Sequence, residues 1–579
     1  MHVAVYYDGD CPFCSRYVQY LRLKDAVTRL HLVDVRTDGE SRRRLTNAGL
    51  DLDNGMVAEI GGRTYHGADA MHALSLLAGP SGWVNRLLAS VFASRPLAVI
   101  AYPVLRAGRS VVLDLLGRGP VAGEDAGLEA KFRLFALLFG FFSVFHAIAY
   151  VLHYGRFPPS PDIIVLLALA VGVVLRPQAR GLFLGLMLVS LISGWLQAPA
   201  SSNHTMLRNY VALAFAVIYV AQLLRGTGWQ RVFADFSVVA GAGLMVMYVF
   251  GIFHKINTGF LDPAVSCAVT LWRMMPPPLS YLDGPVIQYG AIYGTFLVEG
   301  LILVGLFIRP LRHVAVAAGI LFHWLLALSN FSNYLPFTTL SMSLHVLFLS
   351  SGAAARVWAS PVMAAFTLRL RQPLWIAVGA TYVAVMAFMV ALDRYSTATL
   401  LASLFILPVA FAILRYGGVH EASPRSQVAG MRGRALAAVL GGLFFLSCLL
   451  PYAGLKTAQA MNMFANLRVE GGVSNHLVFR DPPSLFDNLA DVVIVTKIEN
   501  APGLRWMLKE GTGIVYNDLL ARLRANPAAT VSFVRDGVLR EDQNAASLAA
   551  DIKTKLYAPV WDKFVAFRPV TLDMPPKCE

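Results

Sequence analysis

The sequence predicts a polytopic α-helical membrane protein of about eleven spans, with a small soluble domain at each end. Composition indicates this class, because 56% of the 579 residues are hydrophobic and only 15% are charged, whereas a soluble globular chain carries about 25% charged residues. The apolar residues also gather in long runs within the middle of the chain. We therefore expect an α/β domain at 1–118, a membrane domain at 130–455 and a small α+β domain at 456–579.

The membrane domain is expected to consist of helices, since an apolar run of about 17–25 residues crosses a bilayer as one helix. Eleven runs fit this description, although the second and third are short. They are roughly 132–153, 162–176, 181–197, 209–225, 236–254, 286–308, 312–330, 334–351, 374–392, 397–415 and 435–453.

The loops between these runs alternate in charge. Basic loops (176–180, 225–231, 309–313, 356–371 and 415–434) alternate with nearly uncharged ones that contain PPSPD, QAPASSNH, SNFSN and DRYSTA. Loops rich in Lys and Arg stay in the cytoplasm. The segment before the first span is also basic, through Arg95, Arg106, Arg109, Arg118, Lys131 and Arg133. We therefore expect a cytoplasmic N-terminal domain and, after an odd number of spans, an extracytoplasmic C-terminal domain.

The formal charge of +14 has the same explanation. No basic stripe with interleaved aromatic residues is present, so no nucleic acid is expected as a partner. The five cysteines (Cys11, Cys14, Cys267, Cys448 and Cys578) are too few for a dense disulfide scaffold. The first residues lack the basic and apolar regions of a signal peptide, and none is expected.

The N-terminal region combines a strand, a C-x-x-C motif and a helix. Residues 3–9 (VAVYYDG) predict a buried strand, and 15–25 predict the helix. The positive end of that helix stabilises a thiolate on Cys11, and Cys14, one turn later, can close a disulfide with it. A second strand is expected at 30–35, and a hairpin followed by a helix at 56–71. A metal site would need a second cysteine pair nearby, so no metal is expected.

The residues YDGDCPFC (7–14) and GGRTYHGADA (61–70) resemble the DCC-type thiol-disulfide oxidoreductases (DUF393) over about residues 1–118. The resemblance implies a thioredoxin-like fold, Cys11 as the nucleophile, Cys14 as the resolving thiol and a redox-active disulfide between them. Thioredoxins place a cis-proline opposite the motif, and residues 51–64 contain no proline. A vestigial domain without redox activity is the alternative.

Several ionisable residues lie within or beside the predicted spans, where they are costly and usually functional. They are His146, His204, His254, Lys255, Glu299, His323 and His345. His146 and His345 are equally compatible with buried hydrogen bonding, and Glu299 with pairing between helices. His204, Lys255 and His323 are all expected near the outer membrane surface, where they can line one cavity. Snorkelling at a span end is the alternative for Lys255.

Three segments around these residues resemble the vitamin K-dependent γ-carboxylases and the wider horizontally transferred transmembrane (HTTM) domain, over about residues 130–350. They are SNHT with LRNYVALAF, GIFHKINTGF, and LFHWLLALSNFSNYLPFTTLSM. The resemblance implies a quinol of the vitamin K or menaquinol type, oxygen-dependent epoxidation and carboxylation of peptidyl glutamate. Lys255 and His204 would be catalytic, and Asn203, His254 and His323 would bind the quinol. His254 stands where the carboxylase has a second lysine.

The C-terminal domain is expected to contain strands at 491–500 and 531–541 and helices at 514–525 and 544–555. Residues 451–479 look like a segment of bacterial proteins that combine the DCC and HTTM domains. A bacterial inner (cell) membrane is therefore the expected location. We assign no chemistry to this domain, beyond the presentation of a peptide or protein substrate at the outer face.

Two hypotheses follow from these observations. The first is a membrane redox enzyme that joins a cytoplasmic CxxC domain to a quinol-using core, with membrane lipid and quinone as partners. The second is a membrane binding or transport protein whose CxxC domain is regulatory or vestigial. Inverted repeats would favour transport, and the sequence has no visible ones.

Overall fold

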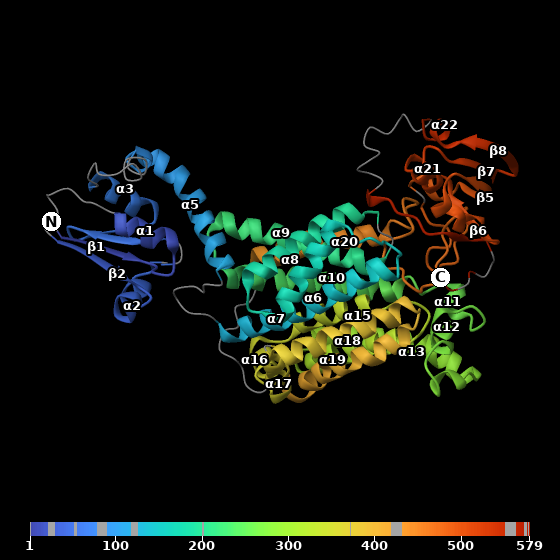
Figure 1. Cartoon of the computed structure of the whole chain (residues 1–579), viewed down its shortest axis with the longest axis horizontal. Coiled ribbons are helices and arrows are strands. Elements are labelled where there is room, and N and C mark those ends of the chain that lie inside the picture. Colours follow the sequence, from blue (N-terminus) through green and yellow to red (C-terminus); the bar gives the residue numbers. More distant parts are fainter. Residues whose placement is uncertain are drawn as a thin grey trace.

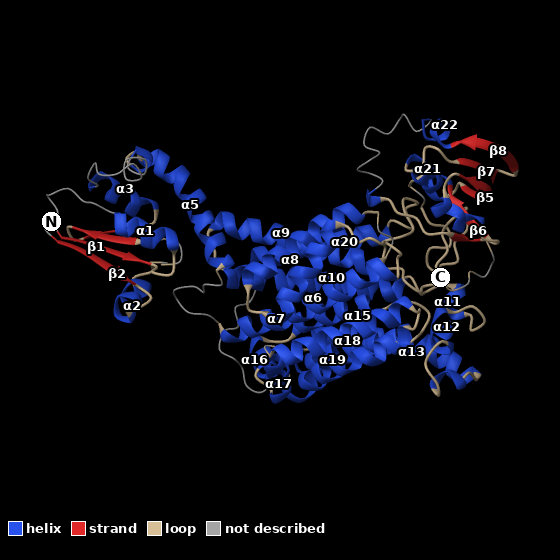
Figure 2. Ribbon diagram, viewed as in Figure 1, coloured by secondary structure: helices blue, strands red, loops and turns tan. Residues whose placement is uncertain are grey.

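The computed structural model describes residues 2–20, 29–50, 52, 55–77, 90–116, 125–199, 202–370, 372–418, 431–483, 485–550, 563–572, 576 and 578. Its described parts form a helical bundle with an α/β region at either end of the long axis (Figures 1 and 2). The end of the bundle beside the N-terminal domain is called the near end below, and the opposite end is called the far end.

The N-terminal region is built on a four-stranded mixed sheet with the order β2-β1-β3-β4. Strand β1 (His2–Tyr7) pairs in parallel with β2 (Arg29–Asp34) and antiparallel with β3 (Val57–Ile60). The last strand, β4 (Arg63–His66), completes the expected hairpin with β3. Three helices accompany the sheet: α1 (Pro12–Tyr20), α2 (Gly39–Asn47) and α3 (Ala68–Leu77). The expected strand and hairpin are therefore confirmed, while residues 21–25 of the expected helix lie outside the described residues.

Helix α5 (Arg95–Leu115) leads from the N-terminal region to the bundle (Figure 1). It packs against α3 on one side and against α8 (Arg180–Gln197) and α9 (Asn203–Arg225) on the other. Arg106 donates a hydrogen bond from Nη2 to the carbonyl oxygen of Leu224 at 3.2 Å. The sequence analysis interpreted this segment only as basic residues before the first span. Arg118, which belonged to that interpretation, lies outside the described residues.

Each of the eleven expected apolar runs contains a helix in the structure. Besides α8 and α9 they are α6 (Ala126–Leu152), α7 (Pro161–Leu175), α10 (Trp229–Phe253), α13 (Pro285–Phe307), α14 (Arg312–Ala327), α15 (Leu335–His345), α18 (Pro373–Ala391), α19 (Tyr395–Tyr416) and α20 (Met431–Leu449). Nine helices in the described part of the chain are long and apolar enough to cross a membrane. They are α5 and eight of these eleven, with α14 counted from Arg309. The remaining three apolar stretches, Pro161–Leu175, Leu335–Phe348 and Gly433–Leu449, are shorter.

Aromatic side chains fill the near half of the bundle core. Phe132 of α6 makes edge-to-face contacts with Phe183 of α8 and with Trp229 and Phe233 of α10. Beside them the buried Glu129 carboxylate accepts a hydrogen bond from Arg180 at 3.1 Å. The expected basic loop 225–231 lies at this near end, because Arg106 of α5 binds the carbonyl of Leu224 directly before it.

The C-terminal region contains an antiparallel sheet with the order β8-β7-β5-β6-β9. The strands are β5 (Val492–Glu499), β6 (Thr512–Val515), β7 (Thr530–Arg535), β8 (Val538–Asn544) and β9 (Val570–Thr571). Helices α21 (Tyr516–Arg524) and α22 (Ala545–Ala550) accompany it. The expected strands and the first expected helix correspond to these elements. Residues 551–555 of the second expected helix lie outside the described residues.

A disulfide joins Cys267 to Cys578 across 311 residues. Cys267 opens the short helix α12 (Cys267–Arg273), which follows α11 (Thr258–Leu261) at the far end of the bundle. The cysteine pattern carried no signal for this bond, because its two residues are neighbours only in the folded chain. Cys11 and Cys14, which were expected to form a redox-active disulfide, are both free thiols in this structure.

Candidate functional site

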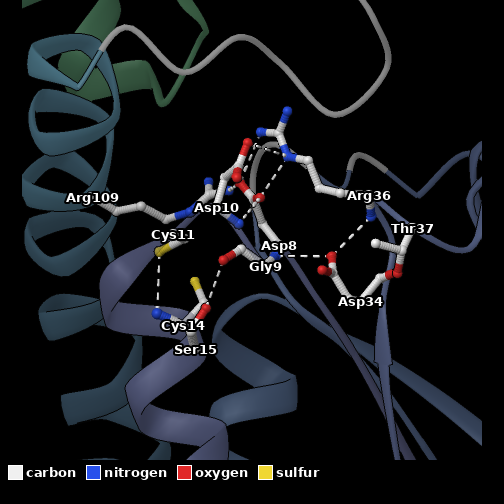
Figure 3. A network of polar contacts seen from close by, with 10 residues as sticks. All are labelled: Asp8, Gly9, Asp10, Cys11, Cys14, Ser15, Asp34, Arg36, Thr37 and Arg109. Atoms are coloured by element: carbon white, nitrogen blue, oxygen red, sulfur yellow. Dashed lines mark hydrogen bonds and ion pairs between the residues drawn. The ribbon is translucent and has the colours of Figure 1, made fainter.

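The CxxC motif lies where β1 ends and α1 begins (Figure 3). Cys11 directly precedes Pro12, the first residue of α1, where proline fits the helix and its missing N–H costs nothing. The backbone N–H of Cys14 donates to Cys11 Sγ at 3.1 Å. Cys11 is fully buried, whereas Cys14 is partly exposed. The helix start thus directs a backbone donor at the sulfur of the first cysteine.

The loop before Cys11 is held by its neighbours in the sheet. Gly9 donates its N–H to Asp34 Oδ1 at 3.0 Å, and its carbonyl accepts from Ser15 Oγ at 2.8 Å. A Cβ on Gly9 would lie 2.0 Å from Asp34 Oδ2, so only glycine fits at this position. The close approach explains the glycine of the YDGDC sequence.

A buried carboxylate carries the charge of the site. Asp8 accepts hydrogen bonds from Arg36 Nε at 2.7 Å and from Arg109 Nη2 at 2.8 Å. Burial alone would raise the pKa of Asp8, but the two guanidinium groups hold that pKa below its ordinary value. Arg36 follows β2, whereas Arg109 reaches the site from α5, outside the sheet (Figure 3).

The two thiols differ in acidity. A hydrogen bond from Cys14 lowers the pKa of Cys11 to about 6, against the effect of burial, with further help from the Cys14 backbone N–H and Arg109. The same bond and burial raise the pKa of Cys14 well above its ordinary value. Both shifts favour a thiolate on Cys11 and a protonated Cys14, which is the direction expected from the position of Cys11 at the helix start.

Sequence reasoning missed three residues of this site. Asp8 belongs to the motif YDGDCPFC (7–14), so the sequence could have predicted a carboxylate close to Cys11. Arg36 and Arg109 had no such signal, because they come from a strand end and from a distant helix. Arg109 was instead counted among the residues that set membrane topology.

At the far end of the bundle, Lys255 forms an ion pair with Glu299. Lys255 Nζ donates to the two carboxylate oxygens of Glu299 at 2.7 and 2.8 Å, and both side chains are buried. Glu299 is a partner between helices, which was the alternative left open for it.

A cavity of about 250 Å³ lies beside this ion pair. Its walls are mostly apolar, and its polar lining residues include Asn203, Tyr248, Lys255, Glu299 and His323. Among the described residues, the buried atoms Asn203 Oδ1 and His323 Nδ1 have no hydrogen-bond partner. Buried polar atoms without a hydrogen-bond partner are rare in proteins unless a ligand or an ordered water supplies the missing bond. Three of the expected membrane site residues, Asn203, Lys255 and His323, thus share one cavity.

The other two expected membrane residues do not line this cavity. His204 lies 3.3 Å from His146, between Nε2 and Nδ1, and His146 is in turn 2.5 Å from Arg208. His254 uses both ring nitrogens, with Tyr452 Oη at 2.7 Å and the Ala460 carbonyl at 2.8 Å. His254 therefore ties α10 to the segment after α20 and has no nitrogen left for a ligand.

Residues 459–466 close the cavity from the far end. Met461, Met463 and Phe464 line it, although Met461 and Phe464 have φ values of 56° and 52°. Non-glycine residues rarely adopt this left-handed conformation, which is found more often at binding sites. Asn466 secures the segment by accepting from the Cys267 N–H at 2.8 Å. The wall of the cavity is thus linked to the α12 disulfide.

No group of three or more His, Cys, Asp or Glu side chains in the described ranges is arranged to hold a metal ion.

Comparison with known proteins identifies one region. Residues 5–114 match the family of DCC1-like thiol-disulfide oxidoreductases. No curated protein matches the chain, and no solved structure does. The match covers the sheet, the CxxC motif and most of α5, including Arg109. It confirms the resemblance of the N-terminal region, whereas the comparisons give no support to an HTTM or carboxylase-like domain.

Proposed function

We propose that the protein is a membrane-bound redox enzyme, in which a cytoplasmic thiol-disulfide oxidoreductase domain is fused to a helical core that acts on a quinol. The single observation that carries the first half is the buried Cys11 sulfur, which has a backbone donor and a cationic side chain beside it. A thiolate at neutral pH is the requirement for thiol-disulfide exchange. The family match at residues 5–114 supports the same activity.

The exchange proceeds in two balanced steps. The Cys11 thiolate attacks a substrate disulfide, forms a mixed disulfide and releases one substrate thiolate, which takes a proton from water. Cys14 then loses its proton and attacks Cys11 Sγ, so that the second substrate thiolate leaves. The substrate gains two electrons and the Cys11–Cys14 disulfide forms, which a dithiol reductant must reduce again.

Trapping of the mixed disulfide tests this activity. With an aromatic disulfide as substrate, Cys14→Ser is expected to hold the substrate on Cys11, because the resolving thiol is absent. Cys11→Ser is expected to form no adduct, and wild type should release two thiols for each disulfide. Mass spectrometry of the 1–20 peptide reads the adduct. An adduct on Cys14 in the Cys11→Ser variant, at the wild-type rate, would contradict the assigned roles.

The membrane half of the proposal rests on the cavity. Its apolar walls suit the ring and tail of a quinol of the vitamin K or menaquinol type, and Asn203 and His323 offer unpartnered polar atoms to the oxygens of its head. A bound quinol supplies the reducing equivalents for oxygen-dependent epoxidase or carboxylase chemistry. Lys255 and Glu299 hold a proton between them at the cavity wall. In this proposal His204 and His254 do not touch the quinol; their hydrogen bonds hold the helices around the cavity in place.

Quinol binding is tested at Trp272, which also lines the cavity. Added menaquinone is expected to quench its fluorescence, and Trp272→Phe should abolish the signal. Lys255→Arg should keep the ion pair and the fold, yet lose oxygen-dependent quinol oxidation, because arginine is not deprotonated in proteins. If Lys255→Arg oxidises quinol as fast as the wild type, Lys255 has only a structural role.

A binding or transport protein with a regulatory or vestigial CxxC domain is the second candidate. The fully paired Lys255–Glu299 charges favour it, since a satisfied ion pair needs no catalytic task. Quinol that binds without being oxidised would support this candidate.

The proposal also includes location and partners. The Cys267–Cys578 bond supports an extracytoplasmic far end, because disulfides persist in oxidising compartments. A bacterial cell membrane, with a peptide or protein substrate at its outer face, is the setting that we propose.

A further inference from the structure

The thiol site includes a side chain that comes from outside the four-stranded sheet and the helices α1 to α3. Cys11, Cys14, Asp8 and Arg36 all belong to β1, α1 and the residues that follow β1 and β2, whereas Arg109 belongs to α5. The same helix packs against α8 and α9, and Arg106, one turn earlier, binds the carbonyl of Leu224 in α9. The helix that joins the bundle therefore also supplies a charge to the redox centre.

The position of Arg109 is fixed on two sides. Its Nη2 donates to Asp8 Oδ2 at 2.8 Å, and both side chains are buried. Figure 3 shows the guanidinium directed between Asp8 and the Cys11 sulfur. Asp8 is shared with Arg36, which approaches from the opposite side. The carboxylate thus orients Arg109 toward the sulfur and does not itself touch it.

We propose that Arg109 is the cationic partner of the Cys11 thiolate, supplied by α5 to complete a nucleophilic site that β1, α1 and β2 do not complete by themselves. This inference rests on the proposed role of Cys11 and adds a residue to it. A buried positive charge beside sulfur stabilises the thiolate and leaves the neutral thiol and the disulfide unaffected. The reduced form of the pair is stabilised as a consequence.

The charged and titratable groups around Cys11 come from four places. They are Asp8 and Asp10 after β1, Cys14 in α1, Arg36 after β2, and Tyr102 and Arg109 in α5. Arg109 is the group among them that lowers the Cys11 pKa from a different helix. Burial raises the pKa of Tyr102 to about 12, so Tyr102 stays neutral over the useful pH range.

The test measures the alkylation rate of Cys11 against pH in the full-length protein in detergent, by peptide mass spectrometry. Loss of a nearby opposite charge moves a pKa by about 1–3 units. Arg109→Gln is therefore expected to slow alkylation at pH 6 by about fivefold or more. It should also make the dithiol–disulfide midpoint potential more negative. Arg109→Lys should restore part of both, and Arg106→Gln, which removes a charge from the same helix, should change neither.

Two further comparisons keep the outcome decisive. If Arg109→Gln does not fold, Asp8→Asn with Arg109→Gln is compared with Asp8→Asn alone, so that no unpaired carboxylate remains. An unchanged alkylation profile after loss of Arg109, with a low wild-type midpoint, would overturn the role of Arg109 and leave that of Cys11 intact. A wild-type midpoint like that of a free cysteine would instead contradict the proposed function itself.

Discussion

Two cysteines three positions apart have opposite roles because their surroundings differ. Cys11 receives the Cys14 N–H at 3.1 Å and lies beside Arg109, whereas Cys14 has the Cys11 sulfur as its partner. A hydrogen bond between them favours one thiolate and one thiol over two equivalent groups. The proposed division into nucleophile and resolving thiol therefore rests on the start of α1 rather than on residue type.

Gly9 is the residue whose size the thiol site tolerates least. Gly9→Ala would place a methyl group 2.0 Å from Asp34 Oδ2, so we expect the N-terminal domain to lose about 1–3 kcal/mol of stability. Gly39→Ala is the matched control, because only an Arg42 side-chain atom at 3.9 Å faces it. Protease susceptibility of the domain in urea measures the difference. Equal susceptibility of the two variants would contradict the close approach.

The buried ion pair of Lys255 and Glu299 makes a prediction about coupling. Lys255→Met leaves a buried carboxylate without a counter-ion, and we expect a loss of about 3–5 kcal/mol. Lys255→Met together with Glu299→Leu removes both charges and should recover most of that loss. Thermal unfolding in detergent compares Lys255→Met, Glu299→Leu and the double variant. Additive losses would show that the two side chains do not interact.

At the scale of elements, the sequence predicts those helices and strands that depend on the pattern of neighbouring residues. Apolar length located the helices, and the strand and helix expected around the CxxC motif are present as β1 and α1. Contacts between distant elements were not predictable in the same way. The Lys255–Glu299 pair joins residues 44 apart, and Arg109 meets Asp8 across 101 residues. Such contacts depend on how helices pack, for which local spacing carries no signal.

Membrane depth was a partial guide. Common depth was expected for His204, Lys255 and His323, and of these Lys255 and His323 line one cavity, together with Asn203. His204 follows Asn203 directly, yet its side chain lies against His146 instead. Depth places residues along a helix but does not say which face of it they occupy.

The disulfide at the far end joins α12 to the C-terminal tail. Cys267→Ser and Cys578→Ser are each expected to lower stability by about 2–4 kcal/mol. The double variant should lose no more than either single variant, because all three lack the same bond. Thermal unfolding with and without reductant gives the values. Losses that add in the double variant would mean that each cysteine acts separately.

At the scale of the whole molecule, the two candidate sites lie at opposite ends of the bundle (Figure 1). The thiol site is beside α5, while the cavity is closed by residues of the far end. Direct exchange between them is thus not part of the architecture, and a mobile quinol is the carrier that fits the proposal. This separation also makes the two activities testable one at a time.

Thiol labelling in intact cells tests the proposed orientation. A membrane-impermeant maleimide is expected to reach Cys578 and Cys267 only after an impermeant reductant opens their disulfide. Cys14, which is partly exposed, should be labelled only after the cells are permeabilised. Labelling of Cys14 in intact cells would place the N-terminal domain outside and contradict the orientation.

The most direct test of the central claim is the pH dependence of alkylation at each cysteine of the CxxC motif in the reduced wild-type protein. The account predicts that Cys11 reacts with a midpoint near pH 6, because its pKa is lowered to about 6. Its reactivity should fall as the pH drops through that value and the thiolate takes a proton. Cys14 should stay unreactive until far more alkaline pH, because its pKa is raised. Equal midpoints for the two cysteines, at the value of a free thiol of about 8.5, would contradict the claim that Cys11 is the attacking thiolate.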